Sequence, residues 1–229
     1  MSGYYSGWRA RHYNTRWRTF TEKTLSQVLE MIDFTVLRRV PERLDRPPRV
    51  LDVACGTGIL LRKLLERLPN AEVYGVDASA DMLAQAHAVL KDWPNVQLEQ
   101  AVVGAGETAG LPYAPQTFDL VTCTNALHDM LEPVAVLAGL GRLLVPGAQL
   151  VVEDYARGEP PFPWFVVEWL ARRVEEGHVR AYTLAEARSL CTQEGLCVVC
   201  EQAFTVDWLW HGWAIRTSTT SSALTEDLA

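Results

Sequence analysis

Short apolar runs alternate with longer amphipathic segments along the first two thirds of the chain. Residues 59–68, for example, repeat leucine and isoleucine at the spacing of one helix face. The short runs predict strands at residues 49–53, 71–77, 95–100 and 118–125, followed by a fifth strand that ends at residue 155. Strands that alternate with helices predict one α/β domain built around a mostly parallel sheet.

The last third of the chain has a different pattern. Thr183 and Glu186 mark a capping box, TLAE, which predicts a helix that begins there and stops near Gly195. Residues 197–204 and 207–216 then predict a closing pair of antiparallel strands. The remaining residues, 217–229, predict a polar tail.

The turn after the first strand has two glycines separated by one residue, in the sequence VLDVACGTG that ends at Gly58. Gly56 and Gly58 can take positive φ angles and let backbone N–H groups come close to a ligand at the edge of the sheet. Dinucleotide-binding turns usually have a third glycine three positions later, where this chain has Leu61. The turn therefore predicts a nucleotide ligand and argues against one with a diphosphate.

The second strand ends in an acid, Asp77, nineteen residues beyond Gly58. An acid about 20 residues after such a turn accepts hydrogen bonds from ribose hydroxyls. Ser79 follows as the predicted N-cap of a helix that carries Met82 on its apolar face. This order predicts a nucleoside whose ribose meets Asp77 and whose base lies near Met82.

Four ordered blocks of the sequence resemble the class I S-adenosylmethionine-dependent methyltransferases: VLDVACGTG, YGVDASADML, LPYAPQTFDLVTCTNALHDM and LGRLLVPGAQLVVEDY. The resemblance covers residues 45–155 well and the rest of the chain more loosely. It implies a Rossmann-like, doubly wound sheet of seven mostly parallel strands with a C-terminal antiparallel pair, in three α/β/α layers over residues 45–216. Within the family, the pattern is similar to the ubiquinone and menaquinone methyltransferases, whose signature blocks are partly present.

The resemblance also implies roles for residues at the carboxyl edge of the sheet. S-adenosyl-L-methionine, which becomes S-adenosyl-L-homocysteine, would place its methionine end on Asp52, its ribose on Asp77 and its adenine on Met82. Asn125, at the end of the fourth strand, would form the floor of the reaction site. The other residues implied to contact the cofactor are Ala54, Cys55, Gly56, Gly58 and Ala78. The chemistry agrees, because this cofactor has a sulfonium cation and an amino-acid end but no phosphate.

One block departs from the family pattern, in which an acid or a small residue after the third strand meets the adenine amino group. Counting back from the Leu-Pro pair at residues 111–112 gives Glu107 or Thr108 as this contact. Counting forward from the third strand gives Ala101 and Val102 instead, and the two alignments cannot both hold. We predict Glu107, because the Leu-Pro pair fixes the register of the following turn.

Residues 4–25 combine aromatic and basic side chains with a single acid, Glu22. Such a segment could stack on nucleic-acid bases, or its aromatic residues could pack a surface helix while its cations are solvated. In the similar family, the chain before the first strand folds over the cofactor, and a tyrosine such as Tyr13 points at the methionine end. We therefore expect residues 1–44 to form a helical lid.

A second covering element is expected as an insertion at residues 157–182. Its sequence begins with prolines and continues as a helix with an apolar stripe, which Gly177 would end. Similar proteins carry their substrate-recognition element here, which implies that Trp164, Trp169 and Tyr182 line an apolar or aromatic substrate pocket. The alternative is an ordinary helix docked on the sheet.

Methyl transfer needs little acid–base chemistry, because the sulfonium already activates the methyl carbon and the protein mainly aligns the acceptor and excludes water. For an oxygen or carbon acceptor, His128 is the candidate base, since it follows the fourth strand and an unperturbed imidazole has a pKa of about 6.5. Packing at a helix start is its alternative role. Glu153, Asp154 and Tyr155 end the fifth strand and could meet the substrate, and His178 is expected at the surface.

Composition limits the class of partner. The 229-residue chain is 48% hydrophobic and carries a net charge of −7, which argues against nucleic acid as its main partner. Its five scattered cysteines suit a reducing cytoplasm. Cys197 and Cys200 have the spacing of a redox or metal pair, but they lie in a strand pattern with no second pair, so we expect buried strand cysteines and no metal. We recognise no signal peptide or membrane-spanning run.

We therefore expect a cytoplasmic enzyme, monomeric or homodimeric, that uses S-adenosyl-L-methionine to methylate a small and apolar or aromatic molecule. Quinone precursors are the alternative acceptors. An alternative of another class is a cofactor-binding or regulatory module that has lost catalysis. A third, an RNA methyltransferase, depends on the basic N-terminal segment alone.

Overall fold

The computed structural model describes residues 5–157, 165–166, 168–169, 173, 179–207 and 210–219. The chain begins with α1 (Gly7–Arg16), α2 (Arg18–Met31), α3 (Phe34–Arg38) and α4 (Val40–Leu44). Strands and helices then alternate through β1 (Arg49–Val53), α5 (Ile59–Arg67), β2 (Glu72–Asp77), α6 (Ala80–Val89) and β3 (Val96–Gln100). They continue as β4 (Phe118–Thr124), η1 (Leu127–Asp129), α7 (Pro133–Arg142) and β5 (Leu144–Tyr155). The last elements are α9 (Leu184–Gln193), β6 (Cys197–Thr205) and β7 (His211–Ser218).

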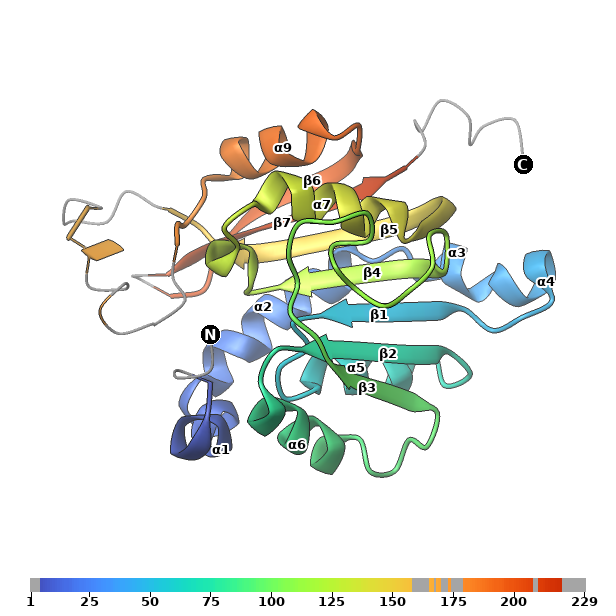
Figure 1. The fold of residues 1–229 in the computed structure, drawn as a ribbon, viewed down its shortest axis with the longest axis horizontal. Helices are drawn as coiled ribbons and strands as arrows, with labels where there is room; N and C mark the ends of the chain where they lie inside the picture. Colours follow the sequence, from blue (N-terminus) through green and yellow to red (C-terminus); the bar gives the residue numbers. More distant parts are fainter. Residues whose placement is uncertain are drawn as a thin grey trace.

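The seven strands form one sheet in the order β3-β2-β1-β4-β5-β7-β6 (Figure 1). The five strands from β1 to β5 are parallel to one another, whereas β7 is antiparallel to both β5 and β6. The order reverses next to β1, so the carboxyl ends of β1 and β4 lie on either side of the switch point where ligands bind in open α/β sheets. The predicted doubly wound sheet with its antiparallel end is confirmed.

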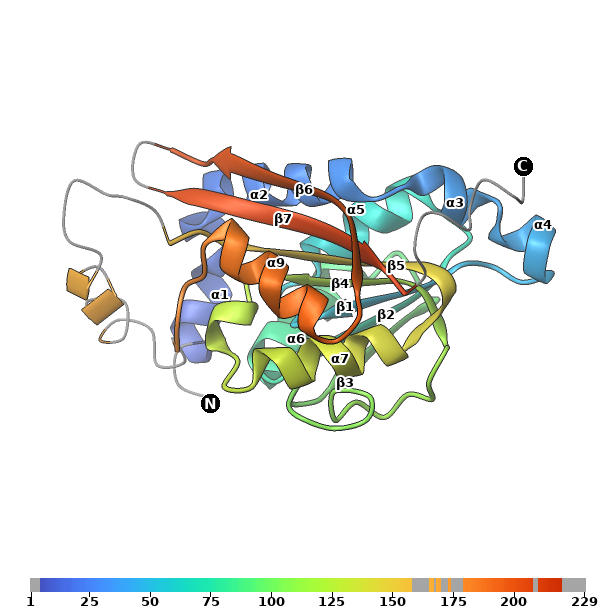
Figure 2. The ribbon, with the colours of Figure 1, turned by 90° about the horizontal axis from the view of Figure 1, so that it is seen from above.

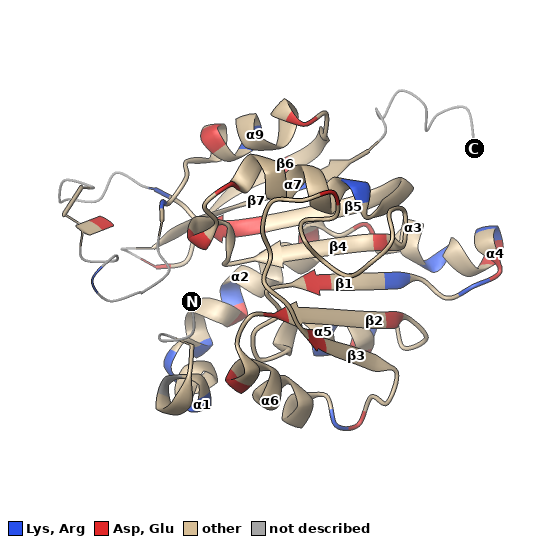
Figure 3. Ribbon diagram, in the orientation of Figure 1, with Lys and Arg blue, Asp and Glu red and all other residues tan. Residues whose placement is uncertain are grey.

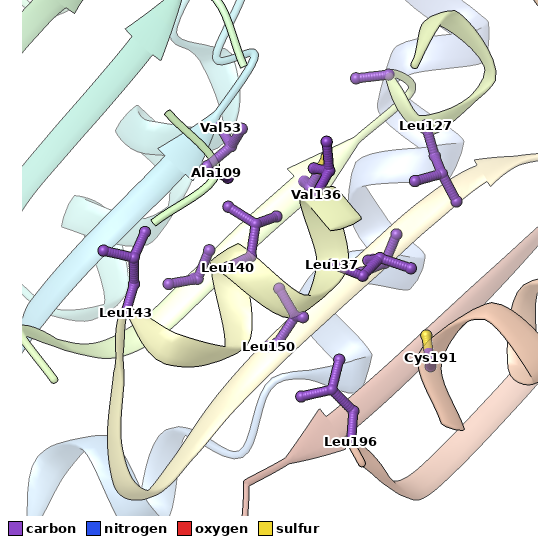
Figure 4. Close-up of a cluster of buried hydrophobic side chains, with 14 of the residues drawn as sticks. Val53, Ala109, Leu127, Val136, Leu137, Leu140, Leu143, Leu150, Cys191 and Leu196 are labelled. Atoms are coloured by element: carbon purple, nitrogen blue, oxygen red, sulfur yellow. The ribbon is translucent and has the colours of Figure 1, made fainter. Parts of the chain in front are cut away.

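Two hydrophobic clusters attach helices to opposite faces of the sheet. On one face α2, α3, α5 and α6 contribute buried apolar side chains, and on the other α7 and α9 do so. Figure 2 shows α2 and α5 on one side of the strands and α7 on the other. Figure 4 shows leucines of α7 pointing toward Val53 of β1 and Leu150 of β5. Helices on both faces of the sheet explain why nearly every residue of β1 and β4 is buried, including Asp52 and Asp119.

Residues 101–117, between β3 and β4, contain no helix. This segment covers the sheet with a turn in which Ala109 is completely buried against α7. A Cβ atom placed on Gly139 of α7 would lie 2.2 Å from the Ala109 nitrogen, so only a glycine permits this contact. The position of the whole segment thus depends on one glycine of α7.

Capping residues begin their helices as the sequence predicts. The Ser79 side chain accepts a hydrogen bond from the Met82 nitrogen at 3.2 Å, and Thr183 and Glu186 form a complete capping box. At the other end of the chain the predicted strand boundaries are wrong. Asp207 lies in the β6–β7 turn, where its Oδ1 accepts from the Trp210 nitrogen, and β7 extends to Ser218 within the predicted polar tail. In the described part of the chain no helix is long and apolar enough to cross a membrane.

Candidate functional site

The described residues enclose a cavity of about 420 Å³ at the carboxyl ends of β1, β2 and β4. This volume falls in the usual range of ligand pockets, roughly 300 to 1,000 Å³. Figure 3 shows acidic positions at the carboxyl ends of β1, β2 and β5. Among the described lining residues there is no lysine or arginine, but there are four acids: Asp52, Asp77, Asp129 and Glu132. Such a cavity favours a ligand with positive charge and disfavours a phosphate.

Asp52, the penultimate residue of β1, is almost completely buried, with 1% of its surface exposed. Its Oδ1 accepts a hydrogen bond from Thr122 Oγ1 of β4 at 2.7 Å. Burial raises the pKa of this carboxyl to about 7, although the hydrogen bond from Thr122 opposes the shift and the charge of Asp77 adds to it. A cation in the cavity would stabilise the ionised form, so Asp52 is suited to a positively charged group.

The two glycines of the β1–α5 turn have different roles. Gly56 lines the cavity, and a Cβ atom on it would meet only Met82 Cε, at 3.5 Å. Gly58 is absent from the described lining, and a Cβ atom there would lie 2.9 Å from Leu90 Cδ1. Gly56 therefore leaves space for a ligand, whereas Gly58 allows α5 and α6 to pack closely. The expected contact of Gly58 with the cofactor is not found in this arrangement.

Leu61 occupies the position of the third glycine in dinucleotide-binding turns. Its side chain is buried next to β2, where a Cβ atom on Gly75 would lie 2.7 Å from Leu61 Cδ1. Close contact between α5 and the sheet is thus permitted by Gly75 of β2 and not by a glycine in the helix.

Asp77 ends β2 and also lines the cavity. Its Oδ2 accepts from the Gly56 nitrogen and its Oδ1 accepts from the Ser79 nitrogen, both at 2.8 Å. Burial raises the pKa of this carboxyl, and the two backbone hydrogen bonds oppose the shift. Because a carboxylate offers about four lone-pair sites, both oxygens keep the capacity to accept from a ligand. Ala78 and Met82 continue the wall from this point.

The N-terminal segment covers one side of the cavity. Tyr5 and Tyr13 contribute from the beginning of the chain and α1, and Thr21 and Leu25 contribute from α2. Three hydrogen bonds of 2.6 Å attach this segment to the domain: the Gly7 nitrogen to Asp81, Ser79 Oγ to the Tyr5 carbonyl and Thr57 Oγ1 to Asn14. Tyr13 thus lines the cavity, while α2 mainly packs on β5 and β7, and the contact of Tyr13 with the methionine end stays a prediction.

The predicted adenine contact at Glu107 or Thr108 is not found. Both residues are absent from the described cavity lining, Glu107 is exposed, and Thr108 Oγ1 donates to the Leu111 carbonyl at 2.8 Å. The segment 101–105 lines the cavity instead, including Ala101 and Val102. The register differs because Ala109 packs against α7, which turns residues 106–111 away from the cavity.

Asn125 follows β4 with a φ angle of 50° and lines the cavity. Its Nδ2 donates to Thr24 Oγ1 at 3.4 Å, whereas its buried Oδ1 has no hydrogen-bond partner in the described part of the chain. A buried amide oxygen without a partner is unfavourable by itself. A hydrogen-bond donor of a ligand would satisfy it.

His128 lies next to the cavity, but it is not among the described lining residues. The residue is 2% exposed, and its Nδ1 lies 2.8 Å from Asp154 Oδ1. Its Nε2 lies 3.3 Å from Asp129 Oδ1, and Asp129 does line the cavity. The prediction that His128 meets the acceptor directly is therefore not supported by this geometry. Asp129 is the residue that the sequence reasoning missed, one position further along the same motif.

The described residues that were predicted to form a substrate pocket, Tyr155, Trp169 and Tyr182, are absent from the described cavity lining. Tyr182 is buried in the hydrophobic cluster with α7 and α9, and its carbonyl accepts from Trp213 Nε1 at 3.0 Å. Tyr155 packs on the His128 ring at 4.5 Å and on Trp210 at 5.7 Å. Trp169 is 54% exposed beneath the guanidinium of Arg173. Trp164, together with Gly177 and His178, lies outside the described residues.

The cysteines are free in the structure. Cys55 is buried where β1 meets the turn, and burial raises the pKa of its thiol well above the ordinary value, so it is a poor nucleophile. Cys197 and Cys200 lie in β6 as predicted, but they are half-buried rather than buried. Among the described residues, no group of three or more His, Cys, Asp or Glu side chains could hold a metal ion.

The chain is similar in sequence to known methyltransferases. Residues 51–150 match a family described as a methyltransferase domain. The 2-phytyl-1,4-naphtoquinone methyltransferase of Thermosynechococcus vestitus is 28% identical over 169 residues, 70% of this chain and 73% of that protein. The demethylmenaquinone methyltransferase of Deinococcus radiodurans is 36% identical over 111 residues, 48% of this chain and 44% of that protein. The chain thus spans less than half the length of the second relative.

Solved structures agree on the fold. A SAM-dependent methyltransferase from Aquifex aeolicus has a TM-score of 0.58 at 20% identity, with 86% of this chain and 98% of that chain covered. Phosphoethanolamine N-methyltransferase 2 of Haemonchus contortus, solved with S-adenosyl-L-methionine, has a TM-score of 0.62 at 14% identity, with 86% and 53% covered. The chain thus has a Rossmann-like fold in which residues 51–150 match a methyltransferase domain, and it resembles the quinone-type class I S-adenosylmethionine-dependent methyltransferases.

Proposed function

We propose that this protein transfers a methyl group from S-adenosyl-L-methionine to a small apolar or aromatic acceptor. The observation that carries the proposal is the cavity at the ends of β1, β2 and β4, which has four acids and neither lysine nor arginine among its described lining residues. A diphosphate would meet carboxylates there without a basic partner, whereas a sulfonium and an ammonium would meet opposite charge.

The residues of the cavity fit the parts of this cofactor. The buried Asp52 carboxyl, whose pKa is raised to about 7, is stabilised in its ionised form by a cation, and Asn125 Oδ1 lacks a donor. Asp77 keeps acceptor capacity for the two ribose hydroxyls. Met82 and Val102 supply apolar contacts for the adenine. Asp52 and Asn125 would hold the amino-acid end, Asp77 the ribose, and Met82 with Val102 the base.

The cofactor, when bound, supplies a methyl carbon that the sulfonium activates for in-line displacement. The chain contributes orientation, because the β1–α5 turn and Asp77 fix the two ends of the ligand. The chain also excludes water, because Tyr5, Tyr13 and Thr21 cover the cavity from the N-terminal side. These contributions require no covalent intermediate with the protein.

The class of acceptor follows from the other end of the cavity. Ala126, Met130, Leu131 and Val136 give this end apolar walls, and Leu131 is 80% exposed. Two curated relatives are named as methyltransferases of a naphthoquinone and of demethylmenaquinone. We infer that a reduced aromatic ring with an apolar substituent, as in a quinol precursor, is the acceptor class to test first.

Calorimetric titration with S-adenosyl-L-methionine, S-adenosyl-L-homocysteine and NAD tests the cofactor. We expect the first two to bind and NAD to give no heat. Asp77→Ala should weaken binding of both adenosyl ligands roughly 10- to 100-fold, because charged hydrogen bonds contribute about 1.5 to 3 kcal/mol. Glu107→Ala is the matched control, since this acid is exposed outside the cavity lining. Binding of NAD with no response to S-adenosyl-L-methionine would refute the proposal.

Release of S-adenosyl-L-homocysteine tests catalysis. We expect turnover with quinols or phenols from a panel that also contains amines. A protein that binds the cofactor but stays silent across the panel would be a binding module. A strongly salt-dependent affinity for RNA, with methyl incorporated into RNA, would point to the RNA methyltransferase instead.

A further inference from the structure

We propose that Asp129, next to the His128 ring that Asp154 orients, is the group that takes the proton from the methyl acceptor, so that His128 is a positioning residue. The inference rests on the proposed function, since it assigns a base to the same reaction. It starts from three residues that lie close in space although 25 positions separate Asp129 from Asp154 along the chain.

Asp154 is the fixed end of this arrangement. It lies near the end of β5, is 1% exposed and accepts hydrogen bonds from two backbone nitrogens, that of His128 at 2.9 Å and that of Tyr155 at 2.8 Å. Its two oxygens lie 2.8 and 3.0 Å from His128 Nδ1. One carboxylate thus fixes both the backbone and the ring of His128.

The imidazole ring of His128 therefore has a defined orientation. With Nδ1 directed at Asp154, Nε2 faces Asp129 Oδ1 at 3.3 Å. The ring also packs on Tyr155 at 4.5 Å. The His128 carbonyl accepts from the backbone nitrogens of Val179 and Arg180, which ties the end of the insertion to this turn. Asp129 Oδ1 and His128 Nε2 do not form a hydrogen bond with each other, so the ring acts on this carboxyl group through its electrostatic field at close range.

Only Asp129 joins this arrangement to the cavity. Its side chain is 21% exposed and lines the cavity beside Asn125, Ala126 and Met130, whereas the side chain of His128 is 3% exposed and is absent from the described lining. A base must reach the proton that it removes, and geometry takes precedence over the usual preference for histidine. The carboxylate of Asp129 meets this condition.

The proposed step balances in atoms and charge. The acceptor oxygen or carbon forms a bond to the methyl carbon while the carbon–sulfur bond breaks. The electron pair of the broken bond stays on sulfur, so the sulfonium becomes a neutral thioether. The acceptor proton moves to Asp129. Asp129 keeps this proton, and the His128 ring, whose orientation Asp154 fixes, sets the electrostatic environment of the Asp129 carboxyl group.

Other charged and titratable groups lie near His128 or near its partner Asp154 in the described part of the chain. Glu153 of β5 is completely buried, and burial raises the pKa of its carboxyl well above the ordinary value. Burial raises the pKa of the Cys123 thiol on β4 too. Arg180 directs its guanidinium at Glu186, 2.6 Å away, while its backbone faces His128. In the described part of the chain, the Asp154 carboxylate is hydrogen-bonded to the ring and the Asp129 carboxylate lies 3.3 Å from it.

Two methyl acceptors that share a ring system but differ in ionisation distinguish a general base from a structural residue. The probes are 1,4-naphthohydroquinone, which is un-ionised near neutral pH, and 2-hydroxy-1,4-naphthoquinone, which is already ionised there. We expect Asp129→Asn to lower kcat at least 100-fold for the first probe, within the range of general-base catalysis. The loss for the second should stay below about fivefold, because no proton has to be removed.

Matched variants complete the kinetic test. Asp129→Glu should recover part of the kcat lost in Asp129→Asn, and His128→Gln or Asp154→Asn should lower kcat with little change in KM for the hydroquinone. Glu107→Gln, an exposed acid outside the described lining, should match wild type. Binding of S-adenosyl-L-homocysteine should change less than threefold in each variant. An equal loss with both acceptors in Asp129→Asn would overturn the assignment.

A ring titration gives a readout that needs no turnover. In protein labelled with ¹⁵N-histidine, with the His128 signal identified by its loss in His128→Gln, Asp129→Asn should move the midpoint of the ring titration to lower pH, because a neighbouring negative charge is removed. Glu107→Gln should leave the midpoint unchanged. An unchanged midpoint in Asp129→Asn refutes the inference, even if neither acceptor is methylated. Failure of the wild-type protein to bind S-adenosyl-L-methionine refutes the proposed function instead.

Discussion

The two halves of the cavity are built in different ways. On the β1–β2 side, the wall comes from a turn and a strand end that are close in sequence, and the backbone nitrogens of Gly56 and Ser79 hold Asp77 in place. On the β4–β5 side, the wall depends on side-chain contacts between distant residues, above all His128 with Asp154. The first half can be predicted from local sequence, whereas the second requires the fold.

The two ways of building the cavity wall suit the two ligands of the proposed reaction. A cofactor that is the same for every member of a family can be held by one local pattern of backbone and acid. An acceptor differs from one enzyme to another, and its half of the cavity is formed by segments that loops and an insertion can change. Under the proposed function, the β1–β2 half would hold the methyl donor and the β4–β5 half would meet the acceptor.

The largest effect that we predict tests the buried acid of the β1–β2 half. The folded pKa of Asp52 is raised to about 7, compared with an ordinary value near 3.9 in the unfolded chain. Its contribution to stability is fully present below about pH 4 and is lost as pH rises through 7, on the order of 4 kcal/mol in total. Urea unfolding between pH 4 and 8 should therefore show a smaller fall in stability for Asp52→Asn than for wild type. Parallel curves for the two proteins would contradict this prediction.

The same carboxyl gives the affinity for S-adenosyl-L-methionine a pH dependence. Because a cation favours the ionised form of Asp52, wild-type affinity should rise as pH increases through 7, and this rise should be absent in Asp52→Asn. Calorimetry at pH 6, 7 and 8 measures it. A wild-type affinity that falls over this range would indicate that the charge of Asp52 opposes binding.

The next effect separates the two glycines of the turn. Gly58→Ala should destabilise the protein by about 2 to 3 kcal/mol, because φ is 74° and the new Cβ would meet Leu90 at 2.9 Å. Gly56→Ala should cost about 1 kcal/mol in stability, since its Cβ would meet only Met82, at 3.5 Å. Its methyl group would enter the cavity and weaken cofactor binding. Chemical denaturation and calorimetry on both variants test the contrast, which fails if the effects on stability are equal.

A smaller effect is expected where the two halves meet. Asn125→Ala should weaken S-adenosyl-L-methionine about tenfold, because its Oδ1 would lose the hydrogen bond to the ligand. Thr24→Ala removes the partner of Nδ2 but leaves Oδ1 in place, so it is the control. Calorimetry should show at most a twofold change in Thr24→Ala. Equal losses in the two variants would mean that Oδ1 does not contact the cofactor.

The smallest effect that we predict concerns which residue after β3 contacts the adenine. Val102→Ala should weaken cofactor binding about threefold to fivefold, because part of an apolar contact with the adenine is lost. Glu107→Ala should change it less than twofold. A larger loss of affinity in Glu107→Ala than in Val102→Ala would support the alignment counted back from the Leu-Pro pair, in which Glu107 contacts the adenine.

Much of the β1–β2 half was predictable because its signals are local. The glycine turn, the acid at the end of β2 and the Ser79 cap each depend on a few neighbouring residues, and the structure has all three. The exception is Gly58. Its contact with Leu90 of α6 depends on how two helices pack, which the turn sequence alone does not contain.

The β4–β5 half was predicted less well for a physical reason. Asp154 fixes the His128 ring, so the neighbouring Asp129 faces the cavity, and spacing within NALHDM does not reveal this choice. In the same way, the contact of Ala109 with Gly139 sets the register of residues 101–111 from a distance. Tyr182 is the last residue of the predicted insertion, but its side chain packs in the hydrophobic core.

A crystal structure of the complex with S-adenosyl-L-homocysteine tests the central claim most directly. We predict the ribose hydroxyls on Asp77, the adenine between Met82 and Val102, and the amino-acid end beside Asp52 and Asn125, with the sulfur facing Asp129. A ligand bound elsewhere, or side chains filling the crevice between the ends of β1 and β2, would contradict the account.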